Sequence, residues 1–70
     1  MIIFTVHALK RMRGRGVSRR QVAVTVEEPD LVETDANDVK LFGRKFSSHA
    51  LEAVAEISKN KIIIITVYWL

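Results

Sequence analysis

The chain has 70 residues, a hydrophobic content of 49% and no cysteine. A chain of this length has room for one small core, so we predict a single domain over residues 1–70, held by apolar packing without disulfides. The lack of cysteine fits a reducing compartment. The longest apolar run, residues 62–70, is far shorter than the roughly 20 residues of a spanning helix, and residues 1–4 are too short for a signal peptide. We therefore expect a cytoplasmic protein that does not enter a membrane.

The charged residues are segregated along the chain, although the net charge is only +3. Residues 7–20 hold six basic residues and no acidic one, whereas residues 27–38 hold six acidic residues and no basic one. Such segregation predicts a dipolar molecule whose basic end suits a polyanion or an acidic protein. A solvated helix followed by an acidic loop is the competing interpretation.

The first predicted element is a helix that begins after Thr5 and ends at Gly16. Threonine is a good N-cap, and glycine suits the left-handed residue that follows a helix. On this helix Ala8, Leu9 and Met12 share one apolar face.

A charged stripe lies beside that apolar face. His7, Arg11 and Arg15 recur every four residues, so their side chains line up along the helix, with Lys10 and Arg13 further out.

The second predicted element is a helix that begins at a capping box, Ser18 to Gln21, and stops near Pro29. Residues 22–26 contain three valines and a threonine, which is also typical of a strand. The cap and the proline favour a helix.

After Asp30 the apolar period changes to two, which predicts four strands at residues 31–35, 39–46, 51–58 and 62–69. A turn is expected at residues 35–38, and the short connections favour antiparallel pairing. The predicted fold is α+β, with two N-terminal helices packed on one face of a mostly antiparallel four-stranded sheet.

Most catalytic residue patterns are missing from the sequence. There is no cysteine nucleophile, no glycine-rich phosphate loop, and no ligand spacing between His7 and His49. We therefore expect neither a metal site nor a cofactor.

The residues that remain suit cleavage of a phosphodiester without a metal. Such a reaction needs proton transfer, for which histidine is suited, and cations that stabilise the charged transition state. His7, Arg11, Arg15 and Tyr68 are the candidate catalytic residues. The candidate nucleic-acid-binding residues are Lys10, Arg13, Arg19, Arg20, Arg44 and Lys45. The competing roles are structural: packing or capping for His7, anchoring of acidic groups for the two arginines, and a place in the core or its rim for Tyr68.

Residues 4–18 resemble the opening of a small family, the "domain of unknown function 4258". Its members begin with His-Ala-x-x-Arg-Met-x-x-Arg-Gly-Ile/Val-Ser, and their second helix ends near an acidic residue or asparagine followed by proline, here Glu28-Pro29. They finish in a strand of the type Ile-x-Val-x-Thr-Val-Tyr, matched by residues 62–68. Gly14 departs from the family pattern, which usually has a charged residue there, and the basic residues within 42–46 do not align with it.

The resemblance implies a fold and an activity. The family is similar in its helix-helix-strand layout to RelE/ParE-like and BrnT-like toxins of toxin–antitoxin pairs. This implies ribosome-dependent or free mRNA cleavage, or a non-nucleolytic role, since ParE-type toxins target gyrase. By position the motif residues are His7, Arg11, Arg15 and Tyr68.

Our functional hypothesis is a toxin-type endoribonuclease that needs no metal. The alternative is a non-catalytic, basic nucleic-acid-binding or protein-interaction domain. RNA or the ribosome is the expected partner, and an acidic antitoxin protein and a second copy of the chain are further candidates.

Overall fold

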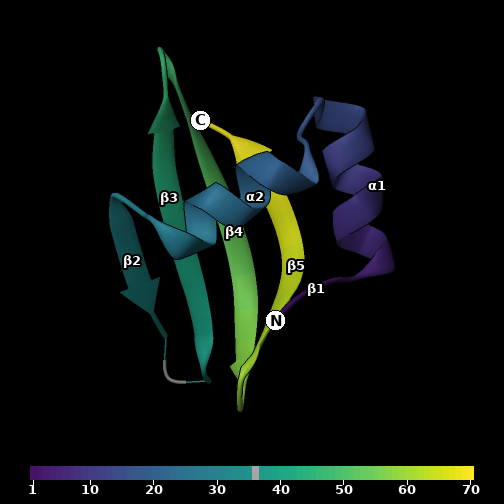
Figure 1. Ribbon diagram of the computed structural model, residues 1–70, viewed down its shortest axis with the longest axis vertical. Coiled ribbons are helices and arrows are strands. Elements are labelled where there is room, and N and C mark those ends of the chain that lie inside the picture. Colours follow the sequence, from purple (N-terminus) through teal and green to yellow (C-terminus); the bar gives the residue numbers. More distant parts are fainter. Residues whose placement is uncertain (36) are drawn as a thin grey trace.

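The computed structural model describes residues 1–35 and 37–70. Within these residues the chain forms two helices and one five-stranded sheet (Figure 1). In chain order the elements are β1 (Ile2–Phe4), α1 (Val6–Arg15), α2 (Arg19–Glu27), β2 (Leu31–Thr34), β3 (Val39–Phe46), β4 (His49–Ser58) and β5 (Lys61–Trp69). The strand order in the sheet is β1-β5-β4-β3-β2.

The α+β class and the two helices agree with the prediction, but the four-stranded, mostly antiparallel sheet is wrong. The sheet is mixed, because β1 adds a fifth strand that pairs in parallel with β5, Ile2 opposite Ile62 and Phe4 opposite Ile64. Three residues are too few to show an alternating pattern, and the partner strand lies at the other end of the chain. The remaining neighbours pair antiparallel, as predicted.

The first helix has the predicted caps. Thr5 Oγ1 accepts a hydrogen bond from the Ala8 backbone N–H at 3.0 Å, and Gly16 ends the helix in the left-handed region with φ 65°. Ala8 and Met12 are buried, and Leu9 packs against the core. Since β1 ends at Phe4, α1 continues alongside the upper part of β5 where a longer strand would have paired.

Residues 22–26 are helical, so the strand interpretation is wrong. The capping box holds the first turn of α2, with Gln21 N–H bonded to Ser18 Oγ at 3.0 Å and Ser18 N–H bonded to Gln21 Oε1 at 2.9 Å. Thr25 is fully buried, and its hydroxyl donates to the Gln21 carbonyl at 2.7 Å. This bond satisfies the hydroxyl and lets a polar residue face the core. The helix lies across β3 and β4.

The predicted turn between β2 and β3 is described in part, because Ala36 lies outside the described residues. Asp35 Oδ1 accepts hydrogen bonds from the N–H groups of Asn37, at 2.7 Å, and Val39, at 3.2 Å. This is the side-chain turn chemistry for which aspartate is favoured.

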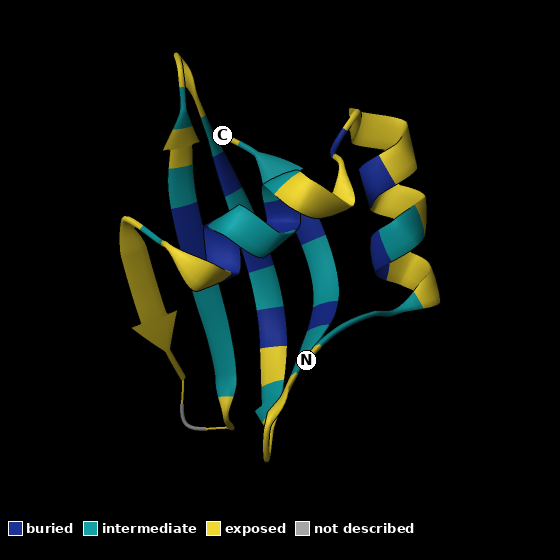
Figure 2. Ribbon diagram, in the orientation of Figure 1, coloured by how far each residue is buried: buried dark blue, intermediate teal, exposed yellow. Residues whose placement is uncertain are grey.

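The core lies between the helices and one face of the sheet (Figure 2). Its largest fully buried side chains include Leu51, Ile64, Val22 and Val67. The alternation of the strands turns Leu41 and Val54 to the opposite face of the sheet. Neither of the two described helices covers this face, which is named the open face. Every residue of β2 is exposed, so this edge strand contributes little to the core.

Candidate functional site

The predicted stripe on α1 is exposed and continuous. Arg11 Nε donates a hydrogen bond to His7 Nε2 at 3.4 Å, so this imidazole nitrogen is an acceptor. Together with Lys10, Gly14 and Arg15, these two residues line a hollow of about 290 Å³. The lining contains one histidine, three cations and no carboxylate. The hollow therefore suits an anion such as a phosphate group.

Arg15 has a second role that the sequence does not reveal. One nitrogen of its guanidinium, Nη1, donates to the Val67 carbonyl at 2.6 Å. The Arg15 carbonyl in turn accepts from the indole Nε1 of Trp69 at 2.9 Å. Near the start of α1, Thr5 Oγ1 donates to the Ile64 carbonyl at 2.8 Å. The Thr5 bond lies where β1 ends, at Ile64, and the two Arg15 bonds hold α1 against β5 beyond that point, so Arg15 connects the stripe to the sheet.

Tyr68 is not part of the hollow on α1. Its neighbours Val67 and Trp69 face the helices, so Tyr68 turns to the open face, opposite Glu52 on β4. Hydrogen bonding with Glu52, burial and the negative charges of Glu52 and Glu33 raise the pKa of the Tyr68 phenol above its ordinary value of 10.0. Its link to the stripe is indirect, through the Arg15 bond to the preceding carbonyl.

The predicted nucleic-acid-binding residues divide into several groups. Lys10 shares the hollow with His7 and also lines a second hollow, with Arg13, Val6 and Leu9. Arg19 lies over the Phe4 ring, 5.0 Å from its centroid, at the start of α2. Arg20 follows it and is exposed.

Arg44 and Lys45, the two candidate residues on β3, lie apart from α1. Arg44 donates to the Glu28 carbonyl and therefore holds the end of α2. The backbone N–H of Lys45 donates to Asp30 Oδ2 at 2.9 Å, and its side chain is exposed. The structure thus gives Arg44 a role in the fold and leaves the Lys45 ammonium at the surface.

A second histidine lies in a hollow that the sequence did not predict. His49 lines a space of about 490 Å³ with Gln21, Phe46, Ser47 and Trp69. Phe46 and His49 are cross-strand partners on either side of a tight turn, but Trp69 comes from the last strand. The hairpin of β3 and β4 could have been used to predict that Phe46 and His49 are neighbours. Nothing local in the sequence indicates their contact with Trp69.

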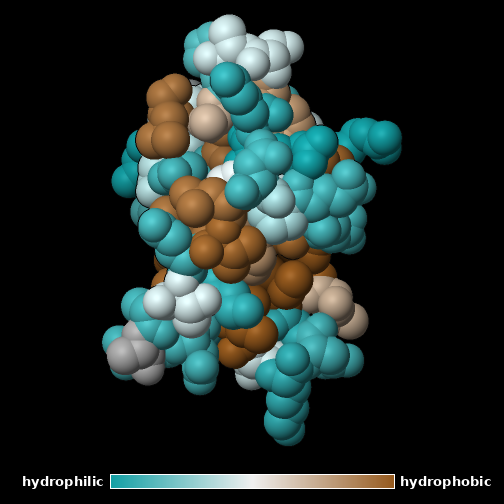
Figure 3. Space-filling view, turned by 90° about the vertical axis from the view of Figure 1, so that its left-hand side faces the viewer, coloured by the Kyte–Doolittle hydropathy of each residue, from teal (hydrophilic) through white to brown (hydrophobic). Residues whose placement is uncertain are grey.

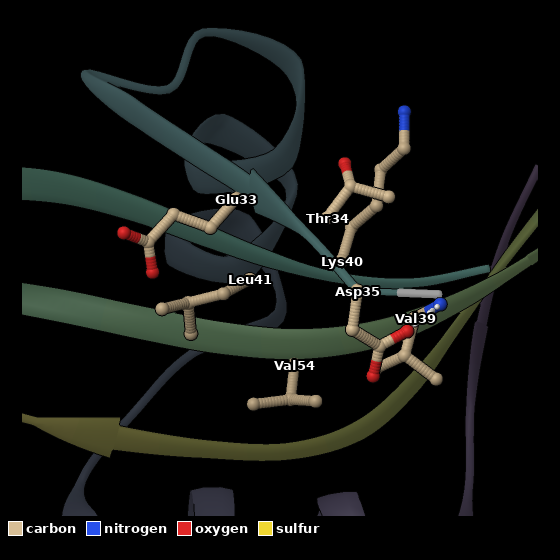
Figure 4. Close-up of a pocket in the computed structure, with 7 residues that line it drawn as sticks. All are labelled: Glu33, Thr34, Asp35, Val39, Lys40, Leu41 and Val54. Carbon is tan, nitrogen blue, oxygen red and sulfur yellow. Dashed lines mark hydrogen bonds between the residues drawn. The ribbon is translucent and has the colours of Figure 1, made fainter. Parts of the chain in front are cut away.

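A further hollow, with two carboxylates in its lining, lies at the other edge of the sheet. It has a volume of about 600 Å³ and is lined by Glu33, Thr34, Asp35, Val39, Lys40, Leu41 and Val54. Figure 4 shows Leu41 and Val54 side by side, with the carboxylates of Glu33 and Asp35 to the two sides of them. Because these carboxylates repel phosphate, this hollow is a poor site for a nucleic acid.

Within residues 1–35 and 37–70 there is no group of three or more histidine, aspartate or glutamate side chains placed to hold a metal ion. Among the helices that the structure describes, none is long and apolar enough to cross a membrane.

The fold and the hollow define a small α+β domain with a basic helix at one edge of its sheet. The sequence model of the family described as "Domain of unknown function (DUF4258)" matches residues 4–69, and the chain belongs to this family. No curated protein matched the chain, and no solved structure matched it.

Proposed function

We propose that this protein is a toxin-type endoribonuclease of a toxin–antitoxin pair, which binds RNA along α1 and cleaves it at His7 without a metal ion. The observation that carries the proposal is the hollow on α1, where one histidine lies among three cations. The likeness in layout to RelE/ParE-like toxins, expected from the sequence, points to the same activity. A cytoplasmic location belongs to the proposal, since that is where mRNA is translated.

The chemistry follows from the two bonded side chains. His7 Nε2 is already an acceptor, because Arg11 donates to it. When a phosphate enters the hollow, its oxygens offer the Arg11 guanidinium a stronger acceptor than a neutral imidazole. Arg11 then binds the phosphate, and His7 Nε2 is left to take the proton of the attacking 2′-hydroxyl. The 2′-oxygen forms a bond to phosphorus as the bond from phosphorus to the 5′-oxygen breaks, and the leaving 5′-oxygen takes a proton from water. Lys10 and Arg11 stabilise the negative charge that develops on the phosphate oxygens.

The second candidate is a nucleic-acid-binding domain without catalysis. It is favoured by the position of Tyr68, which lies on the open face beside Glu52. His7 is then the one residue of the hollow suited to proton transfer near neutral pH, and acid–base cleavage of RNA normally uses two such groups.

The deciding experiment measures binding and cleavage of a labelled single-stranded RNA with the purified protein. The variants are His7→Gln and Arg11→Gln, and the matched control is Lys40→Gln, which removes a positive charge from the opposite edge of the sheet. The proposal predicts that His7→Gln loses cleavage but keeps binding, that Arg11→Gln loses cleavage and binds RNA more weakly, and that Lys40→Gln resembles the wild type.

Each other result has a definite meaning. Binding without cleavage by the wild type would favour the non-catalytic domain. Cleavage that survives in both His7→Gln and Arg11→Gln would show that the site lies elsewhere. A wild type that does not bind RNA would exclude both candidates.

A further inference from the structure

The hollow around His49 is an aromatic site at one end of the sheet. It lies where the β3–β4 hairpin, the end of β5 and the first turn of α2 meet. Two of its lining side chains, Phe46 and Trp69, are half-buried, and His49 is exposed. Aromatic surface therefore borders solvent here, and hydrogen-bonding side chains stand next to it.

The aromatic side chains of this hollow are held in place before any ligand binds. The Trp69 ring meets Phe46 edge-to-face, with centroids 6.2 Å apart, and His49 in the same manner at 6.3 Å. Its indole N–H is fixed by the Arg15 carbonyl at 2.9 Å. His49 Nδ1 lies 3.2 Å from Ser48 Oγ. A ligand that stacks here meets rings that lose little conformational freedom on binding.

Arg15 links the basic stripe to this hollow, because its carbonyl bonds the Trp69 indole. The guanidinium of this residue reaches Val67, and its carbonyl holds Trp69, so the last turn of α1 touches both sites. Gln21 of the hollow lies in the first turn of α2 and follows Arg20, which is exposed, whereas the guanidinium of Arg19 lies over Phe4. A chain whose phosphates lie on the stripe can therefore place its next group against the aromatic side chains.

We propose that this hollow binds an unpaired nucleobase of single-stranded RNA. Bases of single strands stack on aromatic side chains, and their edges take hydrogen bonds that polar side chains supply. Gln21 is suited to this role, because the capping box occupies its Oε1 and leaves its NH₂ group as a donor. His49 and Ser47 offer further donors and acceptors at the rim. A base inside a duplex cannot enter the hollow, so the protein selects single strands. This inference rests on the proposed binding of RNA to α1.

Trp69 is the single tryptophan of the chain and lines this hollow, so tryptophan fluorescence reports on it, and a strand without bases controls for an effect through the Arg15 carbonyl. The experiment titrates the protein with a single-stranded RNA, with the same strand in a duplex, and with a strand of equal length that lacks bases. Binding is followed independently by the anisotropy of a label on the RNA. The expected result is quenching of Trp69 by the single strand and none by the other two ligands.

Variants separate the base site from the stripe. His49→Ala is expected to weaken single-strand binding about tenfold, because it removes one of the aromatic side chains against which the base stacks. Ser58→Ala, at the other end of β4, should bind as the wild type does. Arg11→Gln should weaken binding but keep the same quenching at saturation.

Two outcomes overturn the base site. If the single strand binds without quenching Trp69 and His49→Ala binds normally, the base site is wrong while RNA binding on α1 stands. If no RNA binds at all, the base site and the proposed function fail together.

Discussion

The two edges of the sheet have opposite characters. At the β5 edge, β1 and α1 cover the strand, and side chains of Thr5 and Arg15 donate to its Ile64 and Val67 carbonyls. At the other edge, β2 is exposed throughout, and Leu31 and Val32 keep 44% and 45% of their surface accessible. Figure 3 looks onto this side and shows hydrophobic side chains among hydrophilic ones. The β5 edge is therefore covered and basic, and the β2 edge is exposed and acidic.

The difference shows how charge order in the sequence becomes charge order in space. The basic residues 7–20 lie on α1 and at the start of α2, and α1 lies at the β5 edge. The acidic segment, residues 27–38, contains β2, which is the strand at the opposite end of the sheet. Because β4 and β3 lie between the β5 edge and β2, the cations of α1 do not neutralise the carboxylates at the β2 edge, and a polyanion is attracted to one edge and repelled by the other.

The largest expected effect comes from removing a core side chain near the β5 edge. Ile64→Ala on β5 deletes a fully buried side chain and should lower the free energy of unfolding by about 2–5 kcal/mol. Val32→Ala on β2 should change it by less than about 0.5 kcal/mol, since this side chain is exposed. Urea denaturation measures both values. Equal losses would show that β2 is as well packed as β5 and would contradict the difference between the two edges.

A smaller loss is expected when a threonine of the β5 edge is replaced by its isostere. Thr5→Val removes the N-cap of α1 and the donor to the Ile64 carbonyl, which should cost about 1–2 kcal/mol in stability. The control Thr34→Val, on exposed β2, should be nearly neutral. Thermal unfolding followed by circular dichroism compares the two. A neutral Thr5→Val would mean that α1 is not anchored in this way.

Arg15→Met removes the guanidinium that bonds the Val67 carbonyl and keeps an unbranched chain of similar reach. We expect a loss of about 1 kcal/mol in unfolding free energy, the typical net value of one hydrogen bond. Arg13→Met, on the same helix but away from β5, should leave stability unchanged. If Arg13→Met is the more destabilising variant, Arg15 does not hold α1 against β5.

Gly14→Ala should stabilise the protein by about 0.5 kcal/mol. The glycine lies in a helix, and an added Cβ meets nothing within 4 Å, so alanine gains helix propensity without a clash. Denaturant titration tests this, and a loss of stability would show that the glycine has a structural role. Because Gly14 lines the hollow on α1, RNA affinity should not rise with the stability.

The smallest expected change in stability occurs at high pH and arises from Tyr68 on the open face. Since the pKa of Tyr68 is raised in the folded protein, the folded state keeps the phenol proton longer than the unfolded state. Stability should therefore fall as the pH rises above 10.0 and through the folded pKa. Glu52→Gln should lower the pKa of Tyr68, the single tyrosine, in an ultraviolet titration, whereas Glu56→Gln should not. An unchanged pKa in Glu52→Gln would contradict the assigned cause.

Local signals account for the part of the fold that could be predicted. The N-cap at Thr5, the left-handed Gly16 and the Ser18–Gln21 capping box depend on neighbours in sequence, and each is found where the pattern predicts it. The order of the strands after Asp30 follows from alternation and short turns. By contrast, β1 depends on pairing with β5, and a three-residue segment carries no periodic signal of that contact.

The candidate site, too, could be predicted only where it depends on residues close together in the sequence. The spacing of His7, Arg11 and Arg15 predicts their common stripe, and the structure brings them around one hollow. The separation of Tyr68 from that stripe follows from strand register, which fixes the face of each side chain only once the sheet is known. The hollow of His49 and Trp69 joins distant segments, and only tertiary packing creates it.

The most direct test of the account asks which edge of the sheet contacts RNA. Amide NMR spectra of the protein are recorded while a short single-stranded RNA is added. The account predicts that the amide signals of His7, Arg11, Gly14 and Arg15 shift and saturate, while those of residues 31–34 on β2 stay in place. Shifts confined to β2, or no saturable shift anywhere, would contradict it.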